Sequence, residues 1–229
     1  MRIAFHELNY PEGKVKYNDE RLLALQEKFK PDKYSPFFAE LHKDEFVHAD
    51  AIIILEDALL DLLIEDMEKI ETRLERAESA EEKALLEKCR DILNEEKPLC
   101  DAEFTDAEKE ILTVLAFLSY KPVVIVKEAP DVNDAIKLCL EKAKVMFFYT
   151  AGKKEVHAWP VPLGSDAVTC AGKIHSDLAR GFIKADVVSF EDFMTVFNMS
   201  EAQKKGLVKL VDKNYIIEDG SIIEIRFNV

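Results

Sequence analysis

The feature that most restricts the fold of this chain is a change in hydrophobic periodicity at Lys144. Before this residue, apolar side chains such as Leu59, Leu63 and Met67 recur at spacings of three and four, which predicts amphipathic helices. After it, short apolar runs alternate with Gly, Asn and Asp, which predicts short strands joined by turns. The sequence therefore favours an α+β fold with a helix-rich front and a compact tail that contains a sheet.

The front of the chain predicts a small α/β unit with a helical insertion. The segment RIAFHEL at residues 2–8 has the composition of a strand, and a helix is expected over residues 20–29. From about Ala49 the pattern becomes helical as far as Ala77, and Ser79 then caps a second helix. Two such helices joined by a short connection are expected to pack as an antiparallel hairpin, close to coiled-coil geometry.

A helix-strand-helix unit is expected after the hairpin. It has a helix behind the capping box at Thr105, a buried strand over residues 123–126 and a second helix over residues 131–144. In the tail we expect one helix over residues 171–179 and a hairpin turn at residues 218–220. The strands expected in the tail cover residues 145–149, 155–161, 183–190, 215–217 and 221–227.

The net charge limits the partners that the whole chain can bind. Its formal value of -14 argues against general affinity for nucleic acid, because lysine and arginine supply most contacts to phosphate. The acidic excess belongs to residues 1–144, so a local basic face in the tail stays open. No run approaches the roughly 20 apolar residues of a membrane span, so we expect a cytoplasmic protein with no membrane partner.

Cysteine and histidine spacing gives no metal site. The four cysteines, Cys89, Cys100, Cys139 and Cys170, are widely spaced and form no CxxC pair, which favours reduced thiols, although a redox-sensing thiol stays open. None of the five histidines stands at the i, i+4 spacing with which a helix aims two ligands at one ion. We therefore expect no bound metal.

Three segments of the tail carry a resemblance to a known family. They are Tyr149 to Trp159 (YTAGKKEVHAW), Ala171 to Ala185 (AGKIHSDLARGFIKA), and Asp219-Gly220 with the closing Arg226-Phe227-Asn228-Val229. These segments are similar to the C-terminal TGS domain (DUF933) of the YchF/Obg-like ATPases. The resemblance implies a β-grasp, ubiquitin-like fold for residues 145–229.

The rest of the chain resembles a reduced version of the same proteins, in Gly13-Lys14-Val15, Asp19-Glu20-Arg21-Leu22 and Phe117 to Pro122. In that family these segments belong to a nucleotide-binding domain that a helical arm interrupts. The resemblance therefore implies three parts. They are residues 1–50 with 119–144 as a remnant of the nucleotide-binding α/β domain, residues 51–118 as an inserted helical hairpin or coiled-coil arm, and residues 145–229 as the TGS-like β-grasp domain.

The sequence departs from the family in the two motifs that bind the nucleotide. Phosphoryl transfer uses the pattern GxxxxGK[ST] between a strand and a helix, and none of the seven glycines stands in such a pattern. The family's base-reading Asn-x-x-Glu is matched here by Glu128 and Asp131. We therefore expect a degenerate member without the P-loop that is not an enzyme, has no catalytic residue and no cofactor, and acts by binding.

The candidate surface for a partner lies in the tail, where basic side chains bracket the turn and the helix of the TGS-like part, and Trp159 or Phe182 is available to stack on bases. The candidate residues are Lys153, Lys154, His157, Lys173, His175, Arg180 and Lys184. The expected partner is a ribosome, an RNA or an unknown protein, since ubiquitin-like sheets commonly bind proteins, and self-association stays open. The resemblance implies a setting in translation or ribosome-linked regulation. The alternative is an Obg-like protein that binds ATP or GTP in a site completed by a partner.

Overall fold

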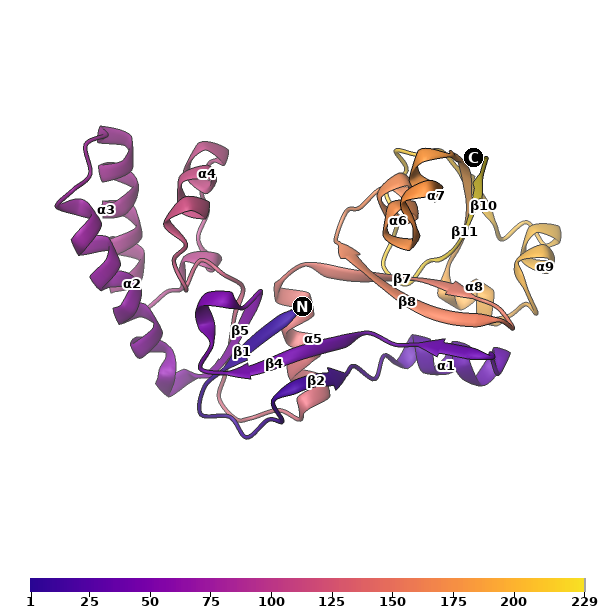
Figure 1. Ribbon diagram of the computed structural model, residues 1–229, viewed down its shortest axis with the longest axis horizontal. Coiled ribbons are helices and arrows are strands. Elements are labelled where there is room, and N and C mark those ends of the chain that lie inside the picture. The colour runs from indigo at the N-terminus through magenta and orange to yellow at the C-terminus, as the bar shows by residue number, and fades with distance from the viewer. Residues whose placement is uncertain (229) are drawn as a thin grey trace. The chain divides into compact units, whose positions relative to one another are not determined.

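The computed structural model describes residues 1–228, and Val229 of the closing motif lies outside the described residues. The chain folds into two compact units. Unit 1 contains residues 1–15 and 39–143, and unit 2 contains residues 16–38 and the segment from Lys144 onward. Each unit has its own sheet (Figure 1). Among residues 1–228, no helix has both the length and the apolar character needed to cross a bilayer.

Unit 1 is built on a five-stranded sheet with parallel central strands. In spatial order these are β2 (Gly13–Lys16), β4 (Phe38–Lys43), β1 (Arg2–Phe5), β5 (Ala51–Leu55) and β6 (Val123–Val126). Ile3 pairs with Leu41 of β4, and Ala4 pairs with Ile52 of β5. Helix α5 (Val132–Lys142) packs on β5 and β6, and a separate cluster that includes Leu62 and Leu118 packs on Ile52 and Ile54. Cover from both sources explains why the two strands are almost continuously apolar.

The start of the arm differs from the sequence-based expectation. Helix was predicted from about Ala49, but residues 51–55 form β5, and helix α2 begins only at Leu59. A short apolar run is ambiguous between a buried strand and a buried helix, and here parallel pairing with β1 and β6 decides in favour of the strand. Two short 3-10 turns, η1 (Phe46–His48) and η2 (Glu56–Ala58), flank β5.

Three helices of unit 1 form an arm with its own hydrophobic core (Figure 1). They are α2 (Leu59–Leu74), α3 (Ala80–Asn94) and α4 (Asp106–Leu115), with the short turn η3 (Leu99–Asp101) between α3 and α4. The predicted capping box is confirmed at the start of α4, where Thr105 and Glu108 cap each other's backbone N–H groups. All three helices contribute to the core, with Ile70, Leu86 and Leu112 fully buried.

A buried carboxylate fixes the base of the arm. Asp66 on α2 is fully buried, and its two oxygens accept hydrogen bonds from the backbone N–H groups of Leu118 at 2.8 Å and Ser119 at 2.7 Å. Lys69 Nζ lies 3.7 Å from the same carboxylate. Because a buried charge is stable only with partners, these contacts hold α2 against the segment that leads into β6.

Unit 2 is built on a six-stranded mixed sheet. In spatial order its strands are β10 (Lys209–Val211), β9 (Phe182–Val188), β11 (Ile222–Phe227), β7 (Val145–Ala151), β8 (Glu155–Pro162) and β3 (Lys33–Ser35). The helices after β8 are α6 (Ala167–Ile174), α7 (Ser176–Arg180), α8 (Phe190–Met194) and α9 (Met199–Lys204). Helix α6 packs on β8 and β9, over a core that includes Phe148, Cys170 and Val187.

Helix α1 (Glu20–Phe29) and strand β3 pack in unit 2, whereas the sequence grouped residues 1–50 in the α/β unit. Strand β3 pairs in parallel with β8, and α1 packs on β7 and β8. Phe148 belongs to the core under α6, so its neighbour Tyr149 points to the opposite face, where it meets the start of α1. At β7 and β8 the sheet therefore has helical cover on both faces. No local pattern within residues 16–38 reveals a strand partner so distant in sequence.

Two further expectations in the tail are corrected. The helix predicted over residues 171–179 begins at Ala167 and is divided at His175, whose extended backbone separates α6 from α7. The strand predicted over residues 215–217 is only an isolated bridge from Ile216 to Asp166, so the turn at residues 218–220 does not join a two-stranded hairpin. The predicted turn is present, but it connects the isolated bridge at Ile216 to β11.

Candidate functional site

The seven basic residues selected from the sequence fall into two groups in unit 2. Lys153, Lys154 and His157 lie on the hairpin of β7 and β8. The remaining four are carried by α6, α7 and β9 and are Lys173, His175, Arg180 and Lys184. Strands β11 and β7 separate β9 from β8, so the sheet does not gather all seven side chains into one patch.

Most of the second group is engaged within the chain. Arg180 Nη2 lies 2.8 Å from Asp177 Oδ1, and Lys184 Nζ donates to Asp212 Oδ1 at 2.5 Å. His175 Nδ1 accepts the backbone N–H of Asp177 and so caps α7. These intramolecular contacts reduce the charge that this group offers to a partner.

The first group adjoins a lysine that the sequence reasoning missed. The backbone N–H of Lys33 on β3 donates to the carbonyl oxygen of Lys154 at 3.0 Å, which places Lys33, Lys153 and Lys154 together. We call these three exposed residues the lysine cluster. Lys33 Nζ lies 2.8 Å from Glu155, whereas Lys153 and Lys154 have no ion pair with any residue from 1 to 228. Only the pairing of β3 with β8 reveals the third member.

Beside this cluster, the rings of His157 and Trp159 are stacked, with centroids 3.6 Å apart and planes 13° from parallel. Burial lowers the pKa of His157 from its usual 6.5, although Glu155 lies 3.1 Å from Nδ1. Trp159 also stacks with Phe148, and its indole N–H donates to Thr150 at 3.0 Å. Trp159 is therefore occupied by its own neighbours and does not form the base-stacking platform that the sequence suggested.

A polar network in unit 2 joins the start of α1 to the last turn of the chain. Asp19 caps α1 by accepting the backbone N–H of Arg21 at 2.9 Å, and the buried Tyr149 hydroxyl donates to its other oxygen. Arg21 Nη1 lies 2.6 Å from Asp219 Oδ2, and Asp219 Oδ1 accepts the backbone N–H of Phe147 at 2.9 Å. Burial, reinforced by Asp19, raises the pKa of Tyr149 well above its usual 10.0. Three segments of the family resemblance, those that contain Arg21, Tyr149 and Asp219, thus meet in space.

The carboxyl ends of the parallel strands in unit 1 form a different candidate site, because ligands of open α/β sheets bind where the strand order reverses. At this edge His6 Nδ1 lies 2.6 Å from Asp44 Oδ1, and His6 Nε2 lies 3.8 Å from Glu7. Residues 6–12 lead from β1 directly to β2. Acidic side chains therefore follow the first strand, where a phosphate site would present backbone N–H groups and a lysine. Across residues 1–228, no cluster of three His, Cys, Asp or Glu side chains is arranged to hold a metal ion.

Comparison with known proteins shows a similarity to one family. The profile YchF-GTPase_C, described as a protein of unknown function (DUF933), matches residues 145–228. A ribosome-binding ATPase YchF from Bacillus subtilis (strain 168) is 28% identical over 247 residues, a match that covers 79% of this chain and 68% of that protein. The chain is similar to the YchF proteins over most of its length. The ribosome-binding ATPase YchF of Mycoplasma genitalium is 41% identical over 103 residues, and this match covers 45% of the chain but only 28% of that protein.

The fold agrees with this similarity. The structure of the Schizosaccharomyces pombe YchF GTPase superposes with a TM-score of 0.81 at 18% sequence identity, and the match covers 99% of this chain and 97% of that one. At this identity the likeness establishes the mixed α/β fold and nothing further.

The relatives also correct one expectation. The sequence predicted a chain that is not an enzyme, but the YchF relatives are named ribosome-binding ATPases, and the matching structure is that of a GTPase. That expectation is therefore wrong. It depended on two local patterns, the phosphate-binding loop and the base-reading segment, whereas the similarity to YchF extends over most of the chain.

Proposed function

We propose that this chain binds the ribosome and that the lysine cluster of unit 2 contacts ribosomal RNA. The observation that carries the proposal is the identity of 41% over 103 residues with a protein named for ribosome binding. The same proposal includes a TGS-type β-grasp, formed by the sheet and α6 of unit 2, to which α1 and β3 are added. It also includes a cytoplasmic setting, since ribosomes work there.

The local charge supports a contact with phosphate. Although the chain has a formal net charge of -14, exposed charges act over only about 8 Å at physiological salt. Lys153 and Lys154 project from a turn and have no acidic partner among residues 1–228, so their charge is available to phosphate groups. The sequence offered the sheet as an alternative surface for a protein partner, and α1 covers one face of that sheet at β7 and β8.

Co-sedimentation with purified ribosomes at several salt concentrations tests this proposal. The double variant Lys153→Glu/Lys154→Glu should weaken binding. It should also reduce the slope of the logarithm of the binding constant against the logarithm of salt concentration, by the amount expected for about two phosphate contacts. Lys204→Glu/Lys213→Glu is the matched control, because it makes the same change in net charge at exposed lysines of unit 2 outside the cluster. Equal losses in both variants, or no binding by the unchanged protein, would contradict the proposal.

Nucleotide hydrolysis is a second candidate function, favoured by the names of the relatives and by the parallel sheet of unit 1, whose strand order reverses at β1. Because GxxxxGK[ST] does not occur in these 229 residues, we assign no side chain to the phosphates. Calorimetric titration with ATP, GTP and their diphosphates measures binding. Phosphate release with and without ribosomes then separates a self-sufficient site from one that a partner completes.

A further inference from the structure

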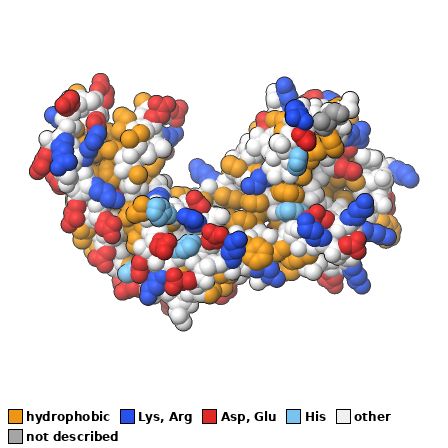
Figure 2. All heavy atoms as spheres, in the orientation of Figure 1, with side chains coloured by type: hydrophobic (Ala, Val, Ile, Leu, Met, Phe, Trp, Pro, Cys, Tyr) orange, Lys and Arg blue, Asp and Glu red, His pale blue; other side chains and the backbone are white. Residues whose placement is uncertain are grey.

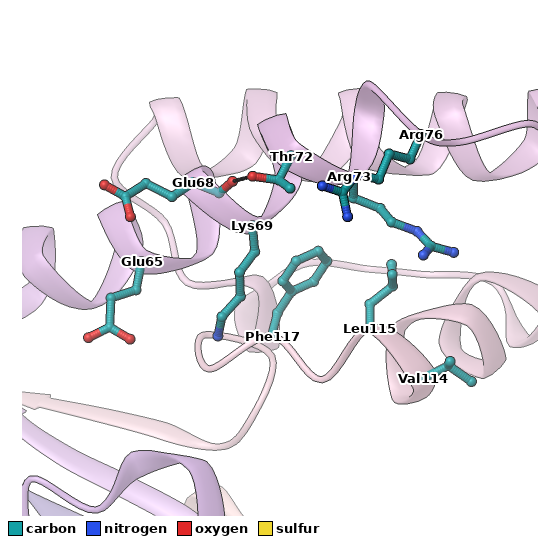
Figure 3. Close-up of a pocket in the computed structure, with 9 residues that line it drawn as sticks. All are labelled: Glu65, Glu68, Lys69, Thr72, Arg73, Arg76, Val114, Leu115 and Phe117. Atoms are coloured by element: carbon teal, nitrogen blue, oxygen red, sulfur yellow. Dashed lines mark hydrogen bonds between the residues drawn. The ribbon is translucent and has the colours of Figure 1, made fainter.

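The arm of unit 1 contains a groove that the proposed ribosome contact does not use. It lies between α2 and the end of α4, with a volume of about 750 Å³. Figure 3 shows Val114, Leu115 and Phe117 on the α4 side and a row of polar side chains along α2. Val114 is 83% exposed, and hydrophobic side chains are visible between α4 and the pair α2 and α3 in Figure 2. An apolar floor in a concave site of this size suits the side chains of a partner.

The charges along the groove are ordered. Glu65 and Glu68 lie at one end of the α2 wall and Arg73 and Arg76 at the other (Figure 3). Glu65, Glu68 and Arg73 lie on α2, and Arg76 follows just after the helix ends at Leu74. All four line the groove. The groove thus has an acidic end beside the middle of α2 and a basic end beside its C-terminus.

Part of this charge is already neutralised inside the arm. Arg73 Nε donates to Glu82 at 2.5 Å, and Lys69 lies 3.7 Å from the buried Asp66. Within residues 1–228, Arg76, Glu65 and Glu68 form no ion pair. Two carboxylates at one end and one guanidinium at the other remain available to a partner.

We propose that this groove binds an amphipathic helix of a partner protein that runs antiparallel to α2. Such a helix brings its N-terminal turn, where acidic residues are favoured, to Arg76, and its C-terminal turn, where basic residues are favoured, to Glu65 and Glu68. Its apolar stripe covers Val114 and Leu115. The three helices of the arm share one core, and the bound helix would be the fourth member of a helical bundle.

A pair of designed peptides tests this directly in fluorescence anisotropy. The first is a helical peptide of about 15 residues with apolar residues at i, i+3, i+4 and i+7, glutamate in its first turn and lysine in its last. The second has the same composition with the charged turns exchanged. We expect the first to bind at least about tenfold more tightly. No binding of either peptide, or equal binding of both, would falsify the proposal.

Variants locate the contact. Arg76→Glu should abolish the preference for the first peptide, and Val114→Asp should weaken both peptides about tenfold or more. Lys83→Glu is the matched control for Arg76→Glu, because Lys83 is an exposed lysine of α3 that does not line the groove. Val114 and Arg76 are both exposed, so thermal unfolding of each variant should match the unchanged protein. Loss of binding in Lys83→Glu to the same degree, or displacement of the peptide by a short RNA, would overturn the assignment.

Discussion

Arg21 and Asp219, which lie 198 positions apart in the sequence, form an ion pair of 2.6 Å in unit 2. Their side chains are 38% and 43% exposed, so the ion pair by itself contributes little to stability. Asp219 also accepts the backbone N–H of Phe147 at 2.9 Å. Because of this second contact, Asp219 contributes more to stability than Arg21 does. Asp219 holds the last turn of the chain to β7, while Arg21 adds α1 to the same place.

The first prediction compares the contributions of Asp219 and Arg21 to the stability of unit 2. Asp219→Ala should lower the free energy of unfolding of unit 2 by about 1–3 kcal/mol, because it leaves the N–H of Phe147 without an acceptor. Arg21→Ala should cost less, about 0–1 kcal/mol. Urea unfolding followed by the fluorescence of Trp159, the single tryptophan, reports on unit 2. Equal costs for the two variants would show that the ion pair, and not the backbone contact, dominates.

The second prediction concerns the glycine beside Asp219. Gly220 has φ of +87°, and a Cβ placed there would lie 2.8 Å from Arg21 Nη1. Gly220→Ala should therefore destabilise unit 2 by about 1–2 kcal/mol through backbone strain, and more if Arg21 cannot move. Gly152 is the control, because its φ is ordinary and nothing lies within 4 Å of its Cβ position. Gly152→Ala should be neutral or slightly stabilising in the same urea experiment.

The third prediction concerns the base of the arm in unit 1. Asp66→Ala removes the acceptor of two buried backbone N–H groups, so we expect a loss of about 3–5 kcal/mol or failure of the arm to fold. Glu65→Ala on the same helix removes an exposed carboxylate and should change stability by less than about 0.5 kcal/mol. Urea unfolding monitored by far-ultraviolet circular dichroism compares the two. A small effect of Asp66→Ala would mean that other contacts hold the arm.

The fourth prediction concerns pH. Burial lowers the pKa of His157 from 6.5, so the unfolded state binds more protons in the window between the lowered value and 6.5. Stability from this group is therefore present above pH 6.5 and is lost as pH falls through the folded-state pKa. Because the rings are stacked 3.6 Å apart, protonation should quench Trp159 fluorescence with a midpoint below 6.5.

Two histidine variants test this assignment. His157→Gln should remove the transition, and His175→Gln should leave it unchanged because His175 is exposed and caps α7 elsewhere in unit 2. A transition that survives His157→Gln, or a midpoint above 6.5, would contradict the assignment.

Local signals predicted the elements that depend on local physics. The capping box at Thr105 marks the start of α4, and Asp131 caps α5 directly after the predicted strand over residues 123–126. Helix α1 was expected over residues 20–29 and has those bounds. In each case the deciding contacts lie within a few residues of one another, so the sequence alone displays them.

Elements that depend on long-range strand pairing could not be predicted from local sequence. The run at residues 51–55 became a strand because β1 and β6 lie on either side of it, and residues 16–38 joined unit 2 because β3 pairs with β8. The candidate site shows the same limit. Lys153 and Lys154 are adjacent in sequence and could be found, while Lys33 becomes their neighbour only through strand pairing.

The assignment of residues 16–38 to unit 2 has a practical consequence for dissecting the protein. The YchF-GTPase_C match begins at residue 145, yet a fragment cut there would lack α1 and β3, leaving Tyr149 without its aspartate and one sheet face bare. Such a fragment would be prone to aggregate through its uncovered strands. A stable excised piece needs both stretches of chain, covalently rejoined or mixed as two peptides, because the homology boundary and the folding boundary do not coincide.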